Sequence, residues 1–296
     1  MTAVRLEVRF ASGKQACAAW LYLPEGKRPA PVIVMGHGLG AIRQMRLDAY
    51  ADRFVAAGYA CLVFDYRHFG DSEGQPRQLL DIDRQLADWA SAVAYARSRP
   101  ELDPERVVLW GSSFGGGHVL VTAARDRKVA AVISQCPFTD GPASARAMGP
   151  AAFIKVGLRA IPDVVFSVLR LRPIMLTIAG RPGSTALLTA PDALPGYLAL
   201  VPQDVQFRNE VAARIGFHGL WRRPGRSASG INCPVLFCVC EKDSLAPAEA
   251  TLRYARKASR GEIALYPLGH FDIYLGDGFE RVVADQIAFL TRHVPR

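Results

Sequence analysis

The sequence predicts an α/β fold, built on a mostly parallel sheet that helices cover on both faces. Short runs of uninterrupted apolar residues recur along the chain, and they alternate with longer segments whose apolar residues have helical spacing. Strands of a parallel sheet are apolar throughout because the helices that connect them bury both faces of the sheet. The chain has 296 residues, and half of them are hydrophobic, which is sufficient for a large buried core.

The apolar runs predict eight strands. The first two flank a Ser-Gly-Lys turn at residues 12–14 and are expected to form an antiparallel hairpin. The remaining strands are expected to be parallel. The eight runs are residues 5–11, 16–23, 31–35, 60–65, 107–110, 129–134, 235–240 and 262–266. Amphipathic segments, in which helices are expected, lie between them at residues 48–57, 79–97 and 116–124.

A long insertion interrupts this alternation. After Asp140 about ninety residues pass before the next clear strand, far more than a crossover between parallel strands needs. We expect residues 142–229 to form a helical cap over the carboxyl edge of the sheet, and residues 1–141 and 230–296 to form the core. One face of a cap helix is predicted by the helical spacing of Ile161, Val164, Val165, Val168 and Leu169. Basic residues around this segment leave open a second interpretation, in which the helix lies on a membrane surface.

The net charge of +9 is concentrated in the insertion. Between residues 142 and 229 there are eleven Lys/Arg against four Asp/Glu, so +7 of the +9 lies there. These charges are scattered and do not form a basic stripe interleaved with aromatic residues, which is the pattern typical of nucleic-acid binding. We therefore expect a solvated surface and no nucleic-acid partner.

The cysteines and the hydropathy pattern limit the class of protein further. The six cysteines lie mostly inside apolar runs, without the spacing of a zinc site or a redox pair, so we expect buried, reduced thiols. No stretch of about 18 uncharged apolar residues occurs, so no stable membrane insertion is expected. The first ten residues alternate apolar and charged side chains and lack the features of a secretion signal, which predicts a cytoplasmic location.

The stretch Gly-Ser-Ser-Phe-Gly at residues 111–115 indicates a chemical function. It follows the predicted strand at residues 107–110 and precedes small residues that suit a helix. A nucleophilic serine placed on such a sharp strand-to-helix turn needs glycine two residues away on either side, because a Cβ at those positions would collide with the backbone. Gly111 and Gly115 satisfy this requirement for Ser113, which is the candidate nucleophile.

A base and an acid follow the candidate nucleophile in the chain. A serine hydroxyl is a poor nucleophile at neutral pH, so it needs a base to take its proton and a third group to orient that base. Asp243 follows the strand at residues 235–240, and His270 follows the strand at residues 262–266. Both lie just beyond the carboxyl ends of strands, where open α/β sheets place their active sites. Asp140, which follows the sixth strand, remains an alternative for the acid.

The chain resembles the α/β-hydrolase superfamily in its serine turn, in the order serine, aspartate, histidine, and in its eight-strand pattern. The segments at residues 65–74 and 269–274 are similar to those of bacterial esterases and of relatives of the X-prolyl-peptidase group. The resemblance implies an oxyanion hole, because His37-Gly-Leu-Gly40 follows a strand as the H-G-x-G loop of that superfamily does. It would be formed by the backbone N–H groups of Leu39 and Phe114. In this superfamily an insertion after the sixth strand commonly forms a lid.

Other polar residues have ordinary structural interpretations. We expect His37 to orient the oxyanion turn, His118 to pack in the core, and His68 to lie on the surface. Asp65 and Asp71 follow a predicted strand, where aspartates commonly cap the backbone of a turn.

The combined pattern predicts a serine hydrolase that cleaves a carboxylic ester through an acyl-enzyme, with a small-molecule substrate that is small to medium in size and apolar. No metal ion or organic cofactor is expected. A peptidase, a thioesterase or a hydrolase of carbon–carbon bonds would use the same serine and histidine, so these alternatives stay open. So does a ligand-binding protein that turns over slowly, and so does the formation of a homodimer.

Overall fold

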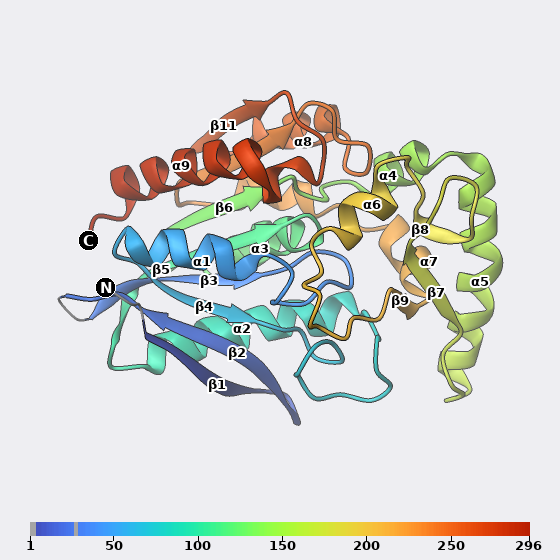
Figure 1. Cartoon of the computed structure of the whole chain (residues 1–296), viewed down its shortest axis with the longest axis horizontal. Coiled ribbons are helices and arrows are strands. Elements are labelled where there is room, and N and C mark those ends of the chain that lie inside the picture. Colours follow the sequence, from blue (N-terminus) through green and yellow to red (C-terminus); the bar gives the residue numbers. More distant parts are fainter. Residues whose placement is uncertain (1–3, 27–28) are drawn as a thin grey trace.

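The computed structural model describes residues 4–26 and 29–296, so residues 1–3 and 27–28 of the predicted core lie outside the described residues. Eight strands form one sheet in the order β1-β2-β4-β3-β5-β6-β10-β11 (Figure 1). Their bounds are Val4–Ser12 for β1, Gln15–Leu23 for β2, Ala30–Gly36 for β3, Ala60–Phe64 for β4, Leu102–Ser112 for β5, Ala131–Gln135 for β6, Val235–Cys240 for β10 and Gly261–Tyr266 for β11. The predicted fold class is confirmed.

Most strands of the sheet are parallel, and the central ones are buried on both faces. The hairpin β1–β2 is antiparallel, and β2 is also antiparallel to β4, whereas the pairs from β4 to β11 are parallel. All residues of β3, β4 and β10 are buried, as expected of strands covered on both faces. Because the six parallel strands run in one direction, their carboxyl ends lie along a single edge of the sheet.

In the described part of the chain, five helices cover the sheet. Helices α1, Leu47–Ala56, and α9, Gly276–His293, pack on one face. Helices α2, Ile82–Ser98, α3, Phe114–Arg125, and α8, Ala248–Ala255, pack on the other. The start of α2 is fixed by Asp81, whose carboxylate accepts hydrogen bonds from two N–H groups of the first helical turn.

The insertion between β6 and β10 is partly helical and partly β-structure. Its elements are α4 Gly141–Met148, α5 Pro150–Val168, β7 Met175–Ala179, β8 Ala186–Leu188, α6 Ala193–Leu198, β9 Glu210–Ala212, α7 Ile215–Leu220 and the 3-10 helix η1 Pro224–Gly230. The strands form a small sheet in the order β8-β7-β9, which the sequence did not predict because β8 and β9 are only three residues long. The division into a core and a cap at residues 142–229 stays a prediction.

Helix α5 forms the outer edge of the insertion in Figure 1. The spacing predicted one apolar helix face, and on that face Ile161, Val165 and Val168 are exposed. The buried face instead consists of Ala152, Val156, Ala160 and Asp163. Small side chains allow a helix to pack closely on its neighbours, so the apolar periodicity of α5 marks its outer face. Within residues 4–26 and 29–296, no helix is both long enough and apolar enough to span a bilayer.

Candidate active site

Ser113 lies at the turn where β5 ends and α3 begins. Its backbone has φ 55° and ψ −116°, a conformation that residues other than glycine rarely adopt. The turn is tight enough that a Cβ added to Gly111 would lie 2.2 Å from the carbonyl oxygen of Gly115. A Cβ on Gly115 would lie 2.5 Å from the carbonyl oxygen of His37. Both glycines are therefore required by backbone contacts, as the sequence predicted.

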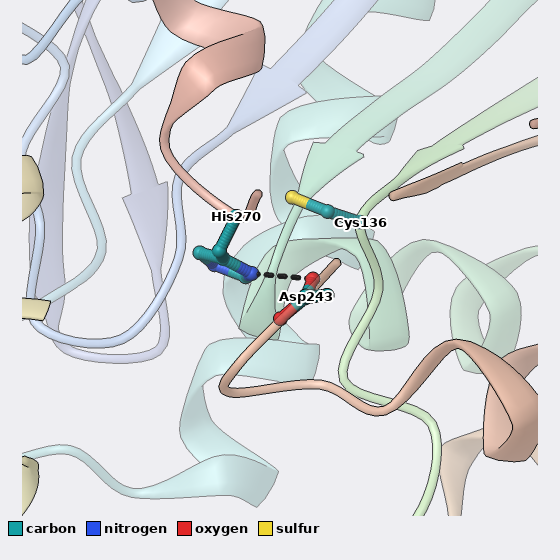
Figure 2. Close-up of side chains that lie close together, drawn as sticks. All are labelled: Cys136, Asp243 and His270. Atoms are coloured by element: carbon teal, nitrogen blue, oxygen red, sulfur yellow. Dashed lines mark hydrogen bonds and ion pairs between the residues drawn. The ribbon is translucent and has the colours of Figure 1, made fainter. Parts of the chain in front are cut away.

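His270 and Asp243 form a hydrogen-bonded chain with Ser113. The Nε2 atom of His270 is 3.0 Å from Ser113 Oγ. Its Nδ1 atom is 2.7 Å from Asp243 Oδ2, and Figure 2 shows this second contact. A carboxylate can only accept, so Nδ1 carries the hydrogen and donates it to Asp243. The lone pair of a neutral imidazole is then on Nε2, facing the serine hydroxyl. This arrangement allows His270 to accept the Ser113 proton.

The loop after β10 fixes the orientation of Asp243. Its Oδ1 atom accepts hydrogen bonds from the backbone N–H groups of Leu245, at 2.9 Å, and Ala246, at 2.7 Å. Its Oδ2 atom is left for His270, and the side chain is 1% exposed. Two backbone donors hold the carboxylate as an acceptor at a fixed position.

The alternative acid has different partners. Asp140 caps α4 by accepting from the N–H of Ala143, and its other oxygen accepts from the hydroxyl of Tyr254 at 2.6 Å and from Arg253 at 3.0 Å. The structure therefore brings Asp243, and not Asp140, to His270.

The loop of the predicted oxyanion hole lies against the serine turn. A Cβ added to Gly38 would lie 2.9 Å from Ser113 Cβ, so the loop approaches as closely as glycine allows. The N–H of Phe114 is among the first of α3, which have no partner within the helix. Within the described residues, no hydrogen bond is formed by the N–H of Leu39 or of Phe114. Both donors can therefore receive a ligand oxygen.

Two side chains hold this loop, and the sequence singled out only one of them, His37. The hydroxyl of Tyr197, from α6 of the insertion, donates to the carbonyl oxygen of Leu39 at 2.8 Å. On the other side, His37 Nδ1 accepts from the N–H of Gly38 at 2.7 Å, and His37 Nε2 donates to the carbonyl oxygen of Met45 at 2.7 Å. Burial lowers the pKa of His37 to about 4, so the ring is neutral at pH 7, as this pattern requires. Nothing in the sequence near Tyr197 signals its contact, because the two segments are distant along the chain.

A cavity of about 510 Å³ opens above Ser113 and His270. The core and the insertion both contribute to its walls, which are mostly apolar. Its lining includes Phe138, Met148, Val156, Leu187, Ile215 and Leu245. The site can therefore hold an apolar group next to the serine hydroxyl.

With this geometry established, similarity to known proteins assigns the chain to a family. Residues 27–274 match the family described as serine aminopeptidase, S33. The chain belongs to this family. The α/β hydrolase GrgF from Penicillium sp. sh18 has a TM-score of 0.82 at 24% sequence identity, covering 99% of this chain and 100% of the other, which shows the shared fold. The expected place in the α/β-hydrolase superfamily is thereby confirmed.

Two curated relatives of this hydrolase carry functional names. The quorum-quenching protein AidA of Acinetobacter baumannii (strain MDR-ZJ06) is 57% identical over 290 residues, which cover 98% of this chain and 95% of that protein. The thiohydrolase aneE of Aspergillus aculeatus is 27% identical over an alignment of 298 positions, which covers 91% of this chain and 87% of that protein.

The thiol of Cys136 lies beside Asp243 and His270 (Figure 2). Potential ligand atoms of Cys136, Asp243 and His270 all lie within 4.8 Å of one another. Burial raises the pKa of the Cys136 thiol, so the thiolate that a metal ion needs is disfavoured. Asp243 also directs its oxygens to hydrogen-bond donors. The chemistry of the group therefore favours a hydrogen-bonded triad over a metal site.

Other candidate residues of the hydrolase lie in buried networks. His118 is 3% exposed and is hydrogen-bonded to Gln85, as expected of a core residue. The surface position expected for His68 is wrong, because its side chain is covered by Arg84 and by the carbonyl of Pro76. Asp65 accepts from backbone N–H groups as expected, and it also forms a buried ion pair with Arg43.

Proposed function

We propose that the hydrolase cleaves a carboxylic ester through an acyl-enzyme formed on Ser113. The observation that carries this proposal is the hydrogen-bonded chain from Ser113 through His270 to Asp243, which opens into an apolar cavity. A nucleophile, a base within hydrogen-bonding distance and a group that orients the base are the requirements of such chemistry.

The acylation step follows from the positions of these atoms. Ser113 Oγ attacks the ester carbonyl carbon while His270 Nε2 takes the hydroxyl proton. The negative oxygen of the tetrahedral intermediate accepts hydrogen bonds from the N–H groups of Leu39 and Phe114. Asp243 stabilises the imidazolium that forms. The carbon–oxygen bond to the alcohol then breaks, and His270 returns the proton to the leaving oxygen.

The deacylation step uses the same groups in reverse. A water molecule loses its proton to His270 and attacks the acyl carbon, and the oxyanion is again held by Leu39 and Phe114. When the intermediate collapses, Ser113 Oγ leaves with the proton from His270, and the carboxylic acid is released. Water is the only co-reactant in this sequence, so no metal ion or organic cofactor takes part.

The cavity supports a substrate with an apolar acyl group. Among the described residues that line it, none carries a carboxylate, so nothing there would bind the free ammonium group of an aminopeptidase substrate. The name of the quorum-quenching relative supports a diffusible signal as the natural substrate. We propose an acylated signal molecule with an ester bond, and this class includes cyclic esters.

Thioester cleavage is the second candidate. It is favoured by the name of the 27% identical thiohydrolase, whose match extends over 91% of this chain. The triad needs no change for this reaction, because a thioester carbonyl is attacked in the same way and a thiolate is a better leaving group than an alkoxide. The choice between ester and thioester depends on how the cavity holds the leaving group.

Labelling with a fluorophosphonate tests the assigned nucleophile. We expect one phosphonyl group per chain, located on Ser113 by peptide mass spectrometry. Ser113→Ala should abolish labelling and lower kcat/KM on a short p-nitrophenyl ester by roughly 10⁴-fold or more. Ser112→Ala is the matched control, since Ser112 contacts Tyr274, Gln135 and Cys136 beneath the turn. It should mainly lower thermal stability. Full activity of Ser113→Ala would refute the mechanism.

A substrate panel tests the scissile bond. Initial rates are compared on an open-chain ester, an acyl lactone, a thioester and a dipeptide amide that share one acyl group where chemistry permits. We expect the highest kcat/KM on one of the two esters, with many turnovers per active site. A higher value on the thioester selects the second candidate. Labelling without repeated turnover on any substrate would instead indicate a ligand-binding protein that has kept its triad.

A further inference from the structure

The outer face of helix α5 is an apolar stripe open to solvent. Six large aliphatic side chains along it are between 52% and 77% exposed. The first five recur every three or four residues, so they lie on one side of the helix, and Leu169 follows directly after its end. We call this set the α5 stripe, and it consists of Ile154, Leu158, Ile161, Val165, Val168 and Leu169. Single exposed apolar side chains are ordinary on a protein surface, whereas a continuous row of this length indicates a binding surface.

The charged residues that border the stripe along the chain are positive. Lys155 and Arg159 follow its members by one residue and lie along one border, and Arg170 and Arg172 lie just beyond its end. The one acidic residue of α5, Asp163, lies on the opposite face, where it is fully buried and bonded to Arg214. The exposed face of α5 therefore combines an apolar row with a basic border and has no carboxylate of its own.

This charge pattern distinguishes between two occupants. A second copy of the chain packed stripe to stripe about a twofold axis would place the basic border of one helix near that of the other. Neither helix would offer an exposed carboxylate to compensate, and like charges facing one another disfavour the pairing. A surface with apolar groups beneath a layer of negative charge matches both the apolar stripe and its basic border.

We propose that α5 docks the protein on the surface of a lipid bilayer that contains anionic headgroups. The helix would lie parallel to the surface, with the stripe in the boundary between headgroups and acyl chains and with the basic side chains on lipid phosphates. Docking of this kind requires no membrane-spanning segment. In Figure 1, α5 lies at the outer edge of the molecule, so a flat surface can reach it without obstruction from the eight-stranded sheet.

Vesicle binding by the full chain tests this proposal without any substrate, so its outcome does not depend on the proposed function. Co-sedimentation is compared between vesicles of phosphatidylcholine alone and vesicles of equal parts phosphatidylcholine and phosphatidylglycerol. We expect clear binding to the mixed vesicles and weaker binding to phosphatidylcholine. Binding to the mixed vesicles should weaken as salt is added, because salt screens the attraction between exposed charges.

Paired variants separate the two parts of the surface. Leu158→Ser with Val168→Ser should weaken binding to mixed vesicles at least about tenfold, through the loss of inserted apolar groups. Arg159→Gln with Arg170→Gln should weaken it by about fivefold for each charge removed, and only on anionic vesicles. These positions are exposed, so the fold should be retained, which circular dichroism and thermal melting check.

Matched controls lie elsewhere on the surface. Leu265→Ser removes an exposed leucine of β11, and Lys257→Gln with Arg260→Gln removes two exposed basic residues beyond α8. None of these should change vesicle binding. The proposal is overturned if mixed vesicles are not bound, or if the α5 and control variants bind equally. A dimer in analytical ultracentrifugation that Leu158→Ser with Val168→Ser dissociates would also overturn it, because a second copy would then be the occupant.

Discussion

The carboxyl edge of the sheet and the inner face of the insertion each bury an aspartate, and the two aspartates have different partners. Asp243, at the sheet edge, accepts two backbone N–H groups on one oxygen and bonds His270 with the other. Asp163, on α5, accepts from the backbone N–H groups of Ile174 and Arg214 and from the Arg214 guanidinium, so both its oxygens face permanent donors.

The comparison shows how one residue type can serve two purposes. In both places backbone N–H groups fix the position of the carboxylate. The remaining side-chain partner, His270 for Asp243 and Arg214 for Asp163, decides whether the carboxylate takes part in chemistry or only in stability. An imidazole can accept and release a proton, so Asp243 is coupled to a proton transfer. A guanidinium stays charged at all accessible pH values, so Asp163 only holds α5 against β7 and α7.

The largest expected effect is on turnover. Asp243→Asn should lower kcat roughly 10³- to 10⁴-fold with little change in the fold, because an amide can donate to His270 Nδ1 and so stabilise the wrong tautomer. Asp140→Asn is the matched control and should leave kcat nearly unchanged while lowering thermal stability. Steady-state kinetics and melting curves measure both. If Asp140→Asn caused the greater loss of kcat, the assignment of the acid would be wrong.

The next effect is on stability and concerns Asp163. Asp163→Ala should lower the free energy of unfolding by about 3–5 kcal/mol, because the Arg214 guanidinium is left without its partner in a mostly buried position. Urea denaturation measures the change. The double variant Asp163→Leu with Arg214→Met should recover much of the loss, since it removes both charges. An equal loss in the single and the double variant would show that the charge pair is not what holds α5.

The stability of the fold is expected to depend on pH through two buried histidines, His37 and His118. Burial lowers the pKa of His37 to about 4 and that of His118 to about 3, so the folded state favours their neutral forms. As pH falls below about 6.5 the unfolded chain binds protons that the folded chain does not, and stability is lost. His37 alone should contribute a loss of roughly 3 kcal/mol between pH 7 and pH 4.

The measurement is urea denaturation at both pH values. His37→Gln should reduce the pH dependence by about that amount, although it also lowers stability at pH 7. An unchanged pH dependence in this variant would contradict the burial argument for His37.

The smallest effect compares two helical glycines. Gly157 of α5 has nothing within 4 Å of an added Cβ, so Gly157→Ala should raise the free energy of unfolding by about 0.5–1 kcal/mol. Gly115→Ala, at the start of α3, should lower it, since its Cβ would lie 2.5 Å from a backbone oxygen. Thermal melting of the two variants measures the difference. If the two substitutions shift the melting temperature in the same direction, the sheet edge is not more crowded at Gly115 than the insertion is at Gly157.

Much of the core could be predicted because its signals are local. The strands of the large sheet are mostly apolar runs, apart from β1, which alternates apolar and charged residues. Their ends could be located to within a few residues. β5 is the exception, beginning at Leu102, because Asp103-Pro-Glu105 breaks the apolar pattern before residue 107. The small sheet of the insertion gave no such signal. His68 was misplaced because a position in a loop does not show that Arg84 and Pro76 cover the side chain.

The sequence by itself determined the sheet, the glycines of the serine turn, and the place of Asp243 and His270 beyond strand ends, since each depends on neighbours within a few residues. The tertiary structure decided that Asp243 rather than Asp140 meets His270, that Tyr197 reaches the Leu39 carbonyl, and that α5 turns its apolar face outward. Those outcomes depend on how segments distant along the chain pack against one another. Periodicity identifies an apolar face, but only packing shows what that face meets.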